Sequence, residues 1–293
     1  MNKSNFLPTI HKLRKIGILA ITSLMLVAAA GCSAPSDPKS AVDDPKNDQA
    51  KQTVITVIGS TSVEKLMTMS ADQYEAANGN VDVQIQAPGS SAGVKAANDG
   101  TANIGMSSRG LKDAELSWGL GEHTFAYDGI AVVVHPSNPV DSITNEQLQK
   151  IFAGEISNWS ELGGKDAEIG LVLREAGSGT RGAFEEILKL DTVAEDKSVI
   201  ADSTNAVTQN VAGKENAIGY VSMGSLNAAT TKALQIDQVD CSAENILAGS
   251  YTLSRPFLLL TKGEVSPEVQ AFLDYLLKDA QTLVNEEGFI PVK

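Results

Sequence analysis

The sequence predicts an α/β protein of two lobes, in which mixed sheets flanked by helices are joined by a hinge of two crossover strands. β-branched segments alternate with segments of helical period in the order β-α-β-α-β, which is typical of parallel sheets covered by helices. Two continuous apolar segments, 128–136 and 251–262, are typical of strands buried on both faces, and they predict the hinge. The 293-residue chain has 262 residues from Cys32 onward, enough for one large domain or two ordinary ones.

The first 31 residues have the pattern of an export signal. A basic segment without acids precedes the apolar run 16–30, which is followed by small residues. The run is about 15 residues long, whereas a membrane-spanning helix needs roughly 20. The string "VAAAGC" resembles a bacterial lipobox, which implies lipidation of Cys32, although Ala29 stands where leucine is usual. The alternative is a plain secretory signal with an incidental cysteine.

The segment after Cys32 is predicted to be a tether. Residues 32–53 are rich in Pro, Asp, Lys and Ser and have almost no large apolar side chain, so they cannot offset their chain entropy by burial. If Cys32 is acylated, Cys241 is the only remaining thiol and no intrachain disulfide can form. The predicted organisation is a signal peptide at 1–31, a tether at 32–53, lobe I at 54–130 and 250–293, and lobe II at 131–249.

Each element of the body has a local signal. The first helix has apolar residues near helical spacing and closes on Asn78-Gly79, and the last helix opens at Ser266-Pro267, a cap followed by an N1 proline. The predicted strands are 54–60, 81–89, 102–108, 128–136, 168–173, 217–223 and 251–262. The predicted helices are 62–79, 90–100, 144–152, 181–190, 203–213 and 266–288.

Three strand-to-helix junctions share one chemistry. They are "GSTS", "PGSSAG" and "GSGT", and each is made of glycine and hydroxyl residues apart from the proline and alanine of the second. A helix N-terminus exposes unpaired N–H groups and about half a positive charge, so it can bind a phosphate or sulfate without a lysine. Any one junction could be an ordinary cap, but three at the carboxyl ends of strands predict a shared anion site. Arg174 could pair with the anion bidentately.

The order of these motifs resembles one family. The strings "GSTS", "PGSSAGVKA", "IGMSSR", "YDGIAVVVHPSNPV", "LQKIFAGEISNWSELGG", "LVLREAGSGTRGAF" and "NAIGYVSMGSL" together are similar to PstS-type proteins, the phosphate-binding components of bacterial phosphate ABC importers. The similarity covers residues 54–293. It implies the type II periplasmic-binding-protein-like fold and capture of inorganic phosphate between the lobes.

The resemblance also implies a set of ligand residues. In the first lobe these would be Thr61, Ser62, Ser90 and Ser108, and in the second Arg174, Ser178, Gly179 and Thr180. Many relatives have an aspartate where this chain has Ser108, and that carboxylate accepts the proton of a phosphate oxygen and thereby rejects sulfate. We expect Asp128 to take over this role, although it could equally orient the hinge or cap N–H groups. Asn205 could reach the cleft, but a simple capping role is the alternative.

The resemblance further implies partners and a location. The chain would be a monomer held by its lipid anchor on the extracytoplasmic face of the cell membrane, and it would deliver phosphate to the permease and ATPase subunits of an importer. It would be neither an enzyme nor a cofactor-dependent protein. Within the binding class, the alternative ligand is another tetrahedral oxyanion such as sulfate or molybdate.

Other chemistries fit the sequence poorly. Gly177, Gly179 and Gly182 match G-x-G-x-x-G, but the strand ends three residues too early for a dinucleotide fingerprint. Ser91 in "GSSAG" and the pair Ser62/Lys65 resemble serine-hydrolase motifs, but the base and the accompanying motifs are missing. The histidines lack metal-ligand spacing. The net charge of −13 becomes −17 without the four cations of the first 31 residues, and no basic stripe is present, which argues against nucleic-acid binding.

Overall fold

The computed structural model of the protein describes residues 52–292. The predicted signal, Cys32 and residues 33–51 of the tether lie outside the described residues. The first part of the described chain alternates strands and helices as β1 (Thr53–Gly59), α1 (Thr61–Ala77), β2 (Val81–Gln86), α2 (Ser90–Asp99) and β3 (Ile104–Ser107). β1 pairs in parallel with both β2 and β3. The predicted parallel β-α-β-α-β unit is therefore confirmed, with β1 starting at Thr53, the last residue of the predicted tether.

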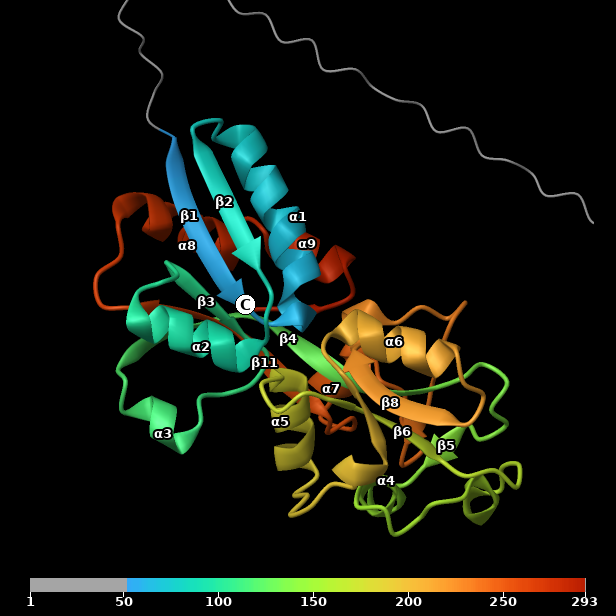
Figure 1. Ribbon diagram of the computed structural model, residues 1–293. Helices are drawn as coiled ribbons and strands as arrows, with labels where there is room; N and C mark the ends of the chain where they lie inside the picture. Colours follow the sequence, from blue (N-terminus) through green and yellow to red (C-terminus); the bar gives the residue numbers. More distant parts are fainter. Residues whose placement is uncertain (1–51, 293) are drawn as a thin grey trace, which may run out of the picture. The chain divides into compact units, whose positions relative to one another are not determined.

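Two long strands occupy the middle of the sheet. β4 (Leu120–Val134) and β11 (Ser254–Lys262) pair antiparallel over most of their length, and β11 also pairs antiparallel with β3. β4 begins eight residues before the predicted strand because residues 120–127 also pair with β11. Beyond Gly129, β4 pairs instead with β8 (Ala217–Ser222), so it runs from one part of the sheet into the other (Figure 1).

The second part of the chain repeats the parallel arrangement. β6 (Gly170–Arg174) pairs in parallel with β8 and with β7 (Ser198–Ala201), a short strand that the sequence did not predict. The main helices here are α4 (Asn145–Phe152), α5 (Gly179–Ile187) and α6 (Thr204–Ala212). The full strand order is β2-β1-β3-β11-β4-β8-β6-β7, with β9 and β12 attached to β4. Smaller elements are α3 (Asp113–Leu116), β5 (Ser142–Ile143), β9 (Lys232–Ala233), β10 (Gln235–Ile236), α7 (Ala243–Leu247) and three 3₁₀ turns at 159–162, 195–197 and 223–225.

The C-terminal region differs from the single helix predicted at 266–288. It forms α8 (Pro267–Lys278) and α9 (Gln281–Glu286), followed by β12 (Ile290–Pro291), which pairs with β4. The amide of the Gln281 side chain donates to the carbonyl of Leu276 at 2.8 Å and to that of Phe125 at 3.1 Å. This side chain satisfies a carbonyl near the end of α8 and links the break between α8 and α9 to β4. Apolar periodicity alone does not reveal such a break.

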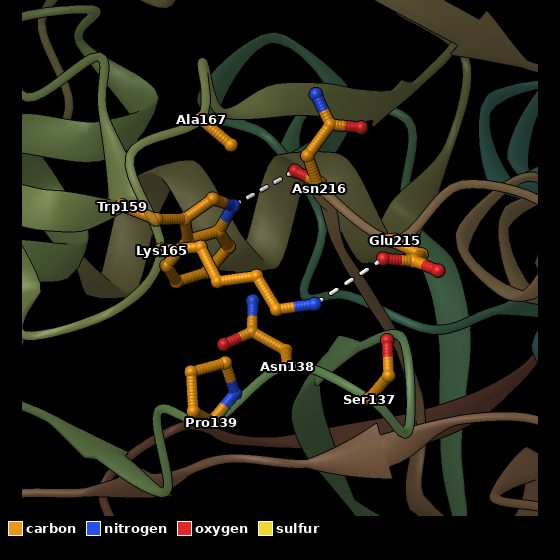
Figure 2. Close-up of a pocket in the computed structure, with 8 residues that line it drawn as sticks. All are labelled: Ser137, Asn138, Pro139, Trp159, Lys165, Ala167, Glu215 and Asn216. Carbon is orange, nitrogen blue, oxygen red and sulfur yellow. Dashed lines mark hydrogen bonds and ion pairs between the residues drawn. The ribbon is translucent and has the colours of Figure 1, made fainter.

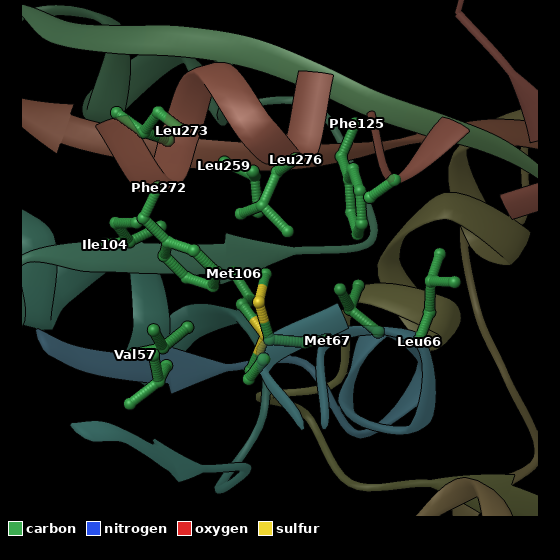
Figure 3. Packing of buried hydrophobic residues seen from close by; sticks show 14 of the residues in the cluster. Val57, Leu66, Met67, Ile104, Met106, Phe125, Leu259, Phe272, Leu273 and Leu276 are labelled. Carbon is green, nitrogen blue, oxygen red and sulfur yellow. The ribbon is translucent and has the colours of Figure 1, made fainter. Parts of the chain in front are cut away.

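Buried apolar residues fall into separate cores on either side of the central strands. One core combines residues before Phe125–Ala126 with residues after Phe257, so the C-terminal helices pack against the first part of the chain. Figure 3 shows Phe272 of α8 beside Ile104 in this core, which also contains Leu273 and Leu276. A second core, from Ile130 to Leu253, lies under α4 and α5, and a third packs α6 against β8. Ile130, Tyr251 and Leu253, which the predicted boundaries assign to lobe I, pack in the second core.

Within residues 52–292, no helix combines the length and apolar character needed to span a bilayer.

Gly93 fixes the close approach of α2 to β1 and β3. A Cβ at this position would lie 2.6 Å from the Gly59 Cα and from the carbonyl oxygens of Ile58 and Met106. These are backbone atoms of the sheet and cannot move aside cheaply. We therefore expect Gly93→Ala to lower the free energy of unfolding by about 1–3 kcal/mol or more, the usual range for overpacking.

Denaturant unfolding of the purified protein measures this effect. Gly79→Ala is the matched control, because no atom lies within 4 Å of its added Cβ. Equal stability of the two variants would contradict the tight packing of α2 on the sheet.

Candidate anion-binding site

The start of α1 meets the starts of α5 and α6 through side-chain hydroxyls. Ser62 Oγ lies 3.0 Å from Thr180 Oγ1 and 3.1 Å from Thr204 Oγ1. Thr61 Oγ1 lies 3.2 Å from the same Thr204 hydroxyl. We call Thr61, Ser62, Thr180 and Thr204 the hydroxyl cluster. Because each residue lies in the first turn of its helix, the positive ends of three helix dipoles meet at this cluster.

A second group of hydroxyls adjoins the start of α5. Ser60 Oγ donates to Ser108 Oγ at 2.8 Å, and Ser90 Oγ accepts from the Ser108 N–H at 3.1 Å. A Cβ on Gly179 would lie 2.2 Å from Ser90 Oγ and 2.6 Å from Ser108 Oγ, so only glycine allows this approach. The start of α2 also contacts this region, because the Ser91 N–H donates to the carbonyl of Gly177 at 3.1 Å. The three predicted junctions therefore meet.

Arg174 connects to the hydroxyl cluster from the end of β6. Its Nε and Nη2 donate to the two oxygens of Glu175 at 2.9 and 3.0 Å, and its Nη1 lies 3.4 Å from Thr204 Oγ1. The side chain is buried, and its backbone is held by the Tyr220 hydroxyl and the Arg181 guanidinium. Glu175 neutralises the charge of Arg174 while leaving one edge of the guanidinium directed toward the cluster.

Asp128 is fully buried and does not lie in the hydroxyl cluster. Its Oδ2 accepts from Nε and Nη2 of Arg255 at 3.0 and 2.8 Å. Its Oδ1 accepts from the Ser222 hydroxyl and the Met223 N–H. Burial raises the pKa of the Asp128 carboxyl, while the charge and hydrogen bonds of Arg255 oppose that shift. The predicted role of Asp128 as an acceptor for the ligand's proton stays a prediction, and four donors on one carboxylate disfavour it, because they use all its acceptor positions.

The predicted ligand Ser178 and its counterpart at the start of α1, Ser60, are helix caps. Ser178 Oγ accepts from the Arg181 N–H at 3.2 Å and so caps α5, which leaves the hydroxyl proton free to donate elsewhere. Ser60 caps α1 by accepting from the Ser62 N–H. The nine residues predicted as phosphate ligands therefore lie in one connected region, with Asp128 joined to it through Arg255, which donates to Ser62 Oγ at 3.2 Å.

An open pocket adjoins the hydroxyl cluster. Its volume is about 880 Å³, and Thr61 and Thr204 are among the residues that line it. The remaining lining comes from α1, α6 and the segment 224–228. The cluster is therefore next to a solvent-accessible space.

A smaller pocket lies elsewhere, at the turn after β4. Figure 2 shows its lining, in which the indole N–H of Trp159 donates to the carbonyl of Asn216 and Lys165 pairs with Glu215. Its volume is about 60 Å³, well below the roughly 300–1,000 Å³ of ordinary small-molecule sites. None of the predicted ligand residues lines it.

The serine-hydrolase alternative lacks its geometry in the described chain. Ser91 Oγ accepts from Arg109, and Lys65 pairs with Glu287 rather than with Ser62. His123 contacts Thr261, and His135 contacts Ser137, so neither imidazole is placed as a base for Ser62 or Ser91. Over residues 52–292, no group of three or more histidine, cysteine or acidic side chains is arranged to hold a metal ion.

Comparison with known proteins decides the family. A family model described as a PBP superfamily domain matches residues 44–280. The phosphate-binding protein PstS of Bacillus subtilis (strain 168) is 34% identical over 279 residues, which cover 94% of this chain and 93% of the relative. This chain belongs to the PstS-type family of the PBP superfamily.

Solved structures of PstS-type and similar proteins share the fold. A Clostridium perfringens protein, described as a phosphate ABC transporter substrate-binding protein with bound phosphate, is 41% identical with a TM-score of 0.80, covering 82% of this chain and 100% of that one. An ABC-type phosphate transport receptor from Vibrio cholerae is 35% identical with a TM-score of 0.69 over the same shares. These likenesses confirm the predicted fold class and the PstS-type resemblance.

Two residues at the hydroxyl cluster are not among the predicted ligands: Thr204, which belongs to it, and Arg255, which donates to Ser62 Oγ. The sequence predicts Asn205 rather than Thr204 as the residue that could reach the cleft, because β7 and therefore the strand-to-helix junction at α6 are not predicted. The sequence places Arg255 in an apolar strand. A lone cation in such a strand needs a buried partner, and Asp128 in the other central strand is the matching lone anion, so this pairing had a usable signal.

Proposed function

We propose that this protein is an extracytoplasmic solute-binding lipoprotein that captures inorganic phosphate between two lobes and delivers it to an ABC importer. The observation that supports this best is the meeting of several helix N-termini and a buried guanidinium at one cluster of hydroxyls. Such an arrangement offers many donors and a positive potential, which a tetrahedral oxyanion requires. The named relatives are phosphate-binding proteins, and the proposal extends that property to this chain.

In this proposal lobe I is built around the first core and lobe II around the second and third cores. Lobe I contains β1–β3, α1, α2 and the C-terminal helices, and lobe II contains β6–β8 and α4–α6. The division of buried residues between the first two cores supports a change of lobe near Asp128–Gly129 on β4 and near Leu253–Ser254 before β11. The sequence-based boundaries at 130/131 and 249/250 lie within a few residues of these positions.

The proposed ligands come from both lobes. Thr61, Ser62, Ser90 and Ser108 would donate from lobe I, and Arg174, Ser178, Gly179 and Thr180 from lobe II. Thr204 joins them because its hydroxyl links Thr61 and Ser62 to Arg174. Burial of the cluster removes competing water, so each charge-assisted hydrogen bond becomes stronger.

Binding and closure are coupled in this proposal. The anion contacts all donors only when the lobes are together, so it stabilises the closed state by its differential affinity. The direct contacts between Ser62 and Thr180 and between Ser91 and Gly177 belong to that state. The closed monomer then docks on a membrane permease driven by an ATPase, and the binding protein itself performs no catalysis.

Another tetrahedral oxyanion, such as sulfate, is the second candidate ligand. The observation that favours it is the occupation of both nearby carboxylates, since Asp128 is bound by Arg255 and Glu175 by Arg174. A site without a free carboxylate rejects sulfate less strongly than a site that has one. Competition between phosphate and sulfate therefore distinguishes the two candidates.

Calorimetric titration of the ligand-stripped protein with phosphate, with sulfate as competitor, tests the proposal directly. We expect phosphate to bind, and we expect Arg174→Ala to weaken binding at least about tenfold, because truncating a buried hydrogen-bonded charge typically costs about 2–5 kcal/mol. Lys165→Ala is the control, since it removes the same charge from an exposed pair. A wild-type protein that binds no phosphate refutes the proposal, and an unchanged Arg174→Ala affinity removes this residue from the site.

Gly179→Ala tests the contact between the lobes. The added methyl group would meet Ser90 Oγ and Ser108 Oγ, whereas alanine is favourable within α5 itself. We expect an affinity for phosphate at least about tenfold lower, with the stability of lobe II retained. Gly110→Ala is the control, because its Cβ meets no atom within 4 Å. Equal affinities of the two variants would show that the start of α5 does not approach Ser90 in the bound state.

The proposed lipid anchor depends on Cys32, which lies outside the described residues. Cys32→Ala removes the thiol that would be acylated, so we expect the protein to move from the membrane to the soluble fraction. Cell fractionation with detection of the protein measures this. Retention of the variant on the membrane would argue against acylation at this residue.

A further inference from the structure

Arg255 is a buried cation that the proposed ligand set does not use. It lies on β11, directly opposite Asp128 in the β4–β11 ladder, and it is 3% exposed. Nε and Nη2 bind the Asp128 carboxylate, and Nη2 also donates to Ser62 Oγ in the hydroxyl cluster. The guanidinium therefore extends from the central strands to the anion site.

The remaining nitrogen of Arg255 is unsatisfied. Within residues 52–292, Nη1 of Arg255 is the only buried side-chain nitrogen or oxygen atom without a hydrogen-bond partner. Leaving a buried donor of a charged group unpaired costs free energy, so such an atom needs a specific reason. An anion at the hydroxyl cluster would supply the missing acceptor.

The orientation of this guanidinium is fixed by its surroundings. Pro256 follows it and restricts the backbone of Arg255 to extended conformations. Asp128 Oδ2 accepts from both nitrogens on one edge of the guanidinium, and the Phe257 ring centroid lies 5.5 Å from its central carbon. With that edge occupied, the opposite side of the group, which carries Nη1, is preorganised rather than free to rotate.

Arg174 approaches the same cluster from the other lobe. Arg174 Nη1 contacts Thr204, Arg255 Nη2 contacts Ser62, and the two hydroxyls lie 3.1 Å apart. Burial lowers the pKa of Arg255, with the like charge of Arg174 adding to this and Asp128 opposing it. An arginine nevertheless stays protonated near neutral pH. The two cations are therefore near neighbours, and an anion between them would relieve their repulsion.

We infer that Arg255 is a second anion-binding arginine of this site, which donates to the bound oxyanion through Nη1, and that Asp128 is its positioning counterion. This inference rests on the proposed function. The anion would bridge a guanidinium of lobe II and a guanidinium of the central strands. Each arginine keeps its own carboxylate, so the ligand's charge is matched mainly by the helix N-termini and by the remaining edges of the two guanidinium groups.

Arg255→Lys tests the inference because lysine can pair with Asp128 but offers no planar second edge. We expect phosphate affinity, measured by calorimetry, to fall at least about tenfold, with the unfolding midpoint changed little. Arg109→Lys is the matched control, since Arg109 is also a buried arginine with two nitrogens bound by one carboxylate, that of Glu115. A wild-type affinity for Arg255→Lys would overturn the inference.

The double variant Asp128→Asn/Arg255→Gln separates ligand binding from structural pairing. Both charges are removed together, so neither is left buried alone, and the fold should be retained. If Arg255 binds the anion, the double variant loses at least about tenfold in phosphate affinity. If Arg255 only stabilises the strands, the folded double variant binds phosphate with the affinity of the wild-type protein. Should the double variant not fold, the result for Arg255→Lys decides. Failure of the wild-type protein to bind phosphate would instead refute the proposed function, so the two failures are distinguishable.

Discussion

The ion pair between Asp128 and Arg255 is the interaction on which the site depends. It joins β4 to β11 in register at the point where the two cores separate, and neither residue is exposed by more than 3%. Removing two charges from water costs several kcal/mol per ion unless the geometry is good and the remaining hydrogen bonds are made. Asp128 meets that condition with four donors, whereas Arg255 leaves Nη1 without one. The two central strands thus carry a cation whose bonding is incomplete beside the proposed ligand residues.

The charge balance around the site explains how an acidic protein can hold an anion. Arg174 and Arg255 each have a carboxylate partner, so the side-chain charges near the cluster nearly cancel. The positive potential then comes from helix N-termini, whose N–H groups are fixed in direction and need no reorganisation when a ligand arrives. Because these dipoles act only over short distances, the net charge of −13 on the full chain does not prevent local binding.

Most of the fold could be predicted because each element has a local signal. β1, α1, β2 and α2 appear within two or three residues of their predicted ends, since Gly and Asn stops and β-branched runs mark them. The misses have physical causes in tertiary contacts. β7 has four residues and gains its partner from β6, and the break between α8 and α9 depends on Gln281 reaching Phe125. Thr61 and Thr180 lie in glycine-rich junctions and Arg174 at a strand end, and the lone charges in two apolar strands were a signal for Arg255, but Thr204 required knowledge of which elements meet.

The occupation of the carboxylates changes how ligand selection has to be explained. A free carboxylate would distinguish oxyanions by accepting a proton, but Asp128 and Glu175 are both bound by arginine. The remaining groups that can accept a hydrogen bond are hydroxyls, among them Ser108, whose Oγ contacts Ser60 and Ser90. A serine hydroxyl can accept a hydrogen bond from a protonated phosphate oxygen or donate one to a bare oxygen. It imposes no charge repulsion on an unprotonated ion, so the geometry of the donors must contribute more to selectivity than in a site with a free carboxylate.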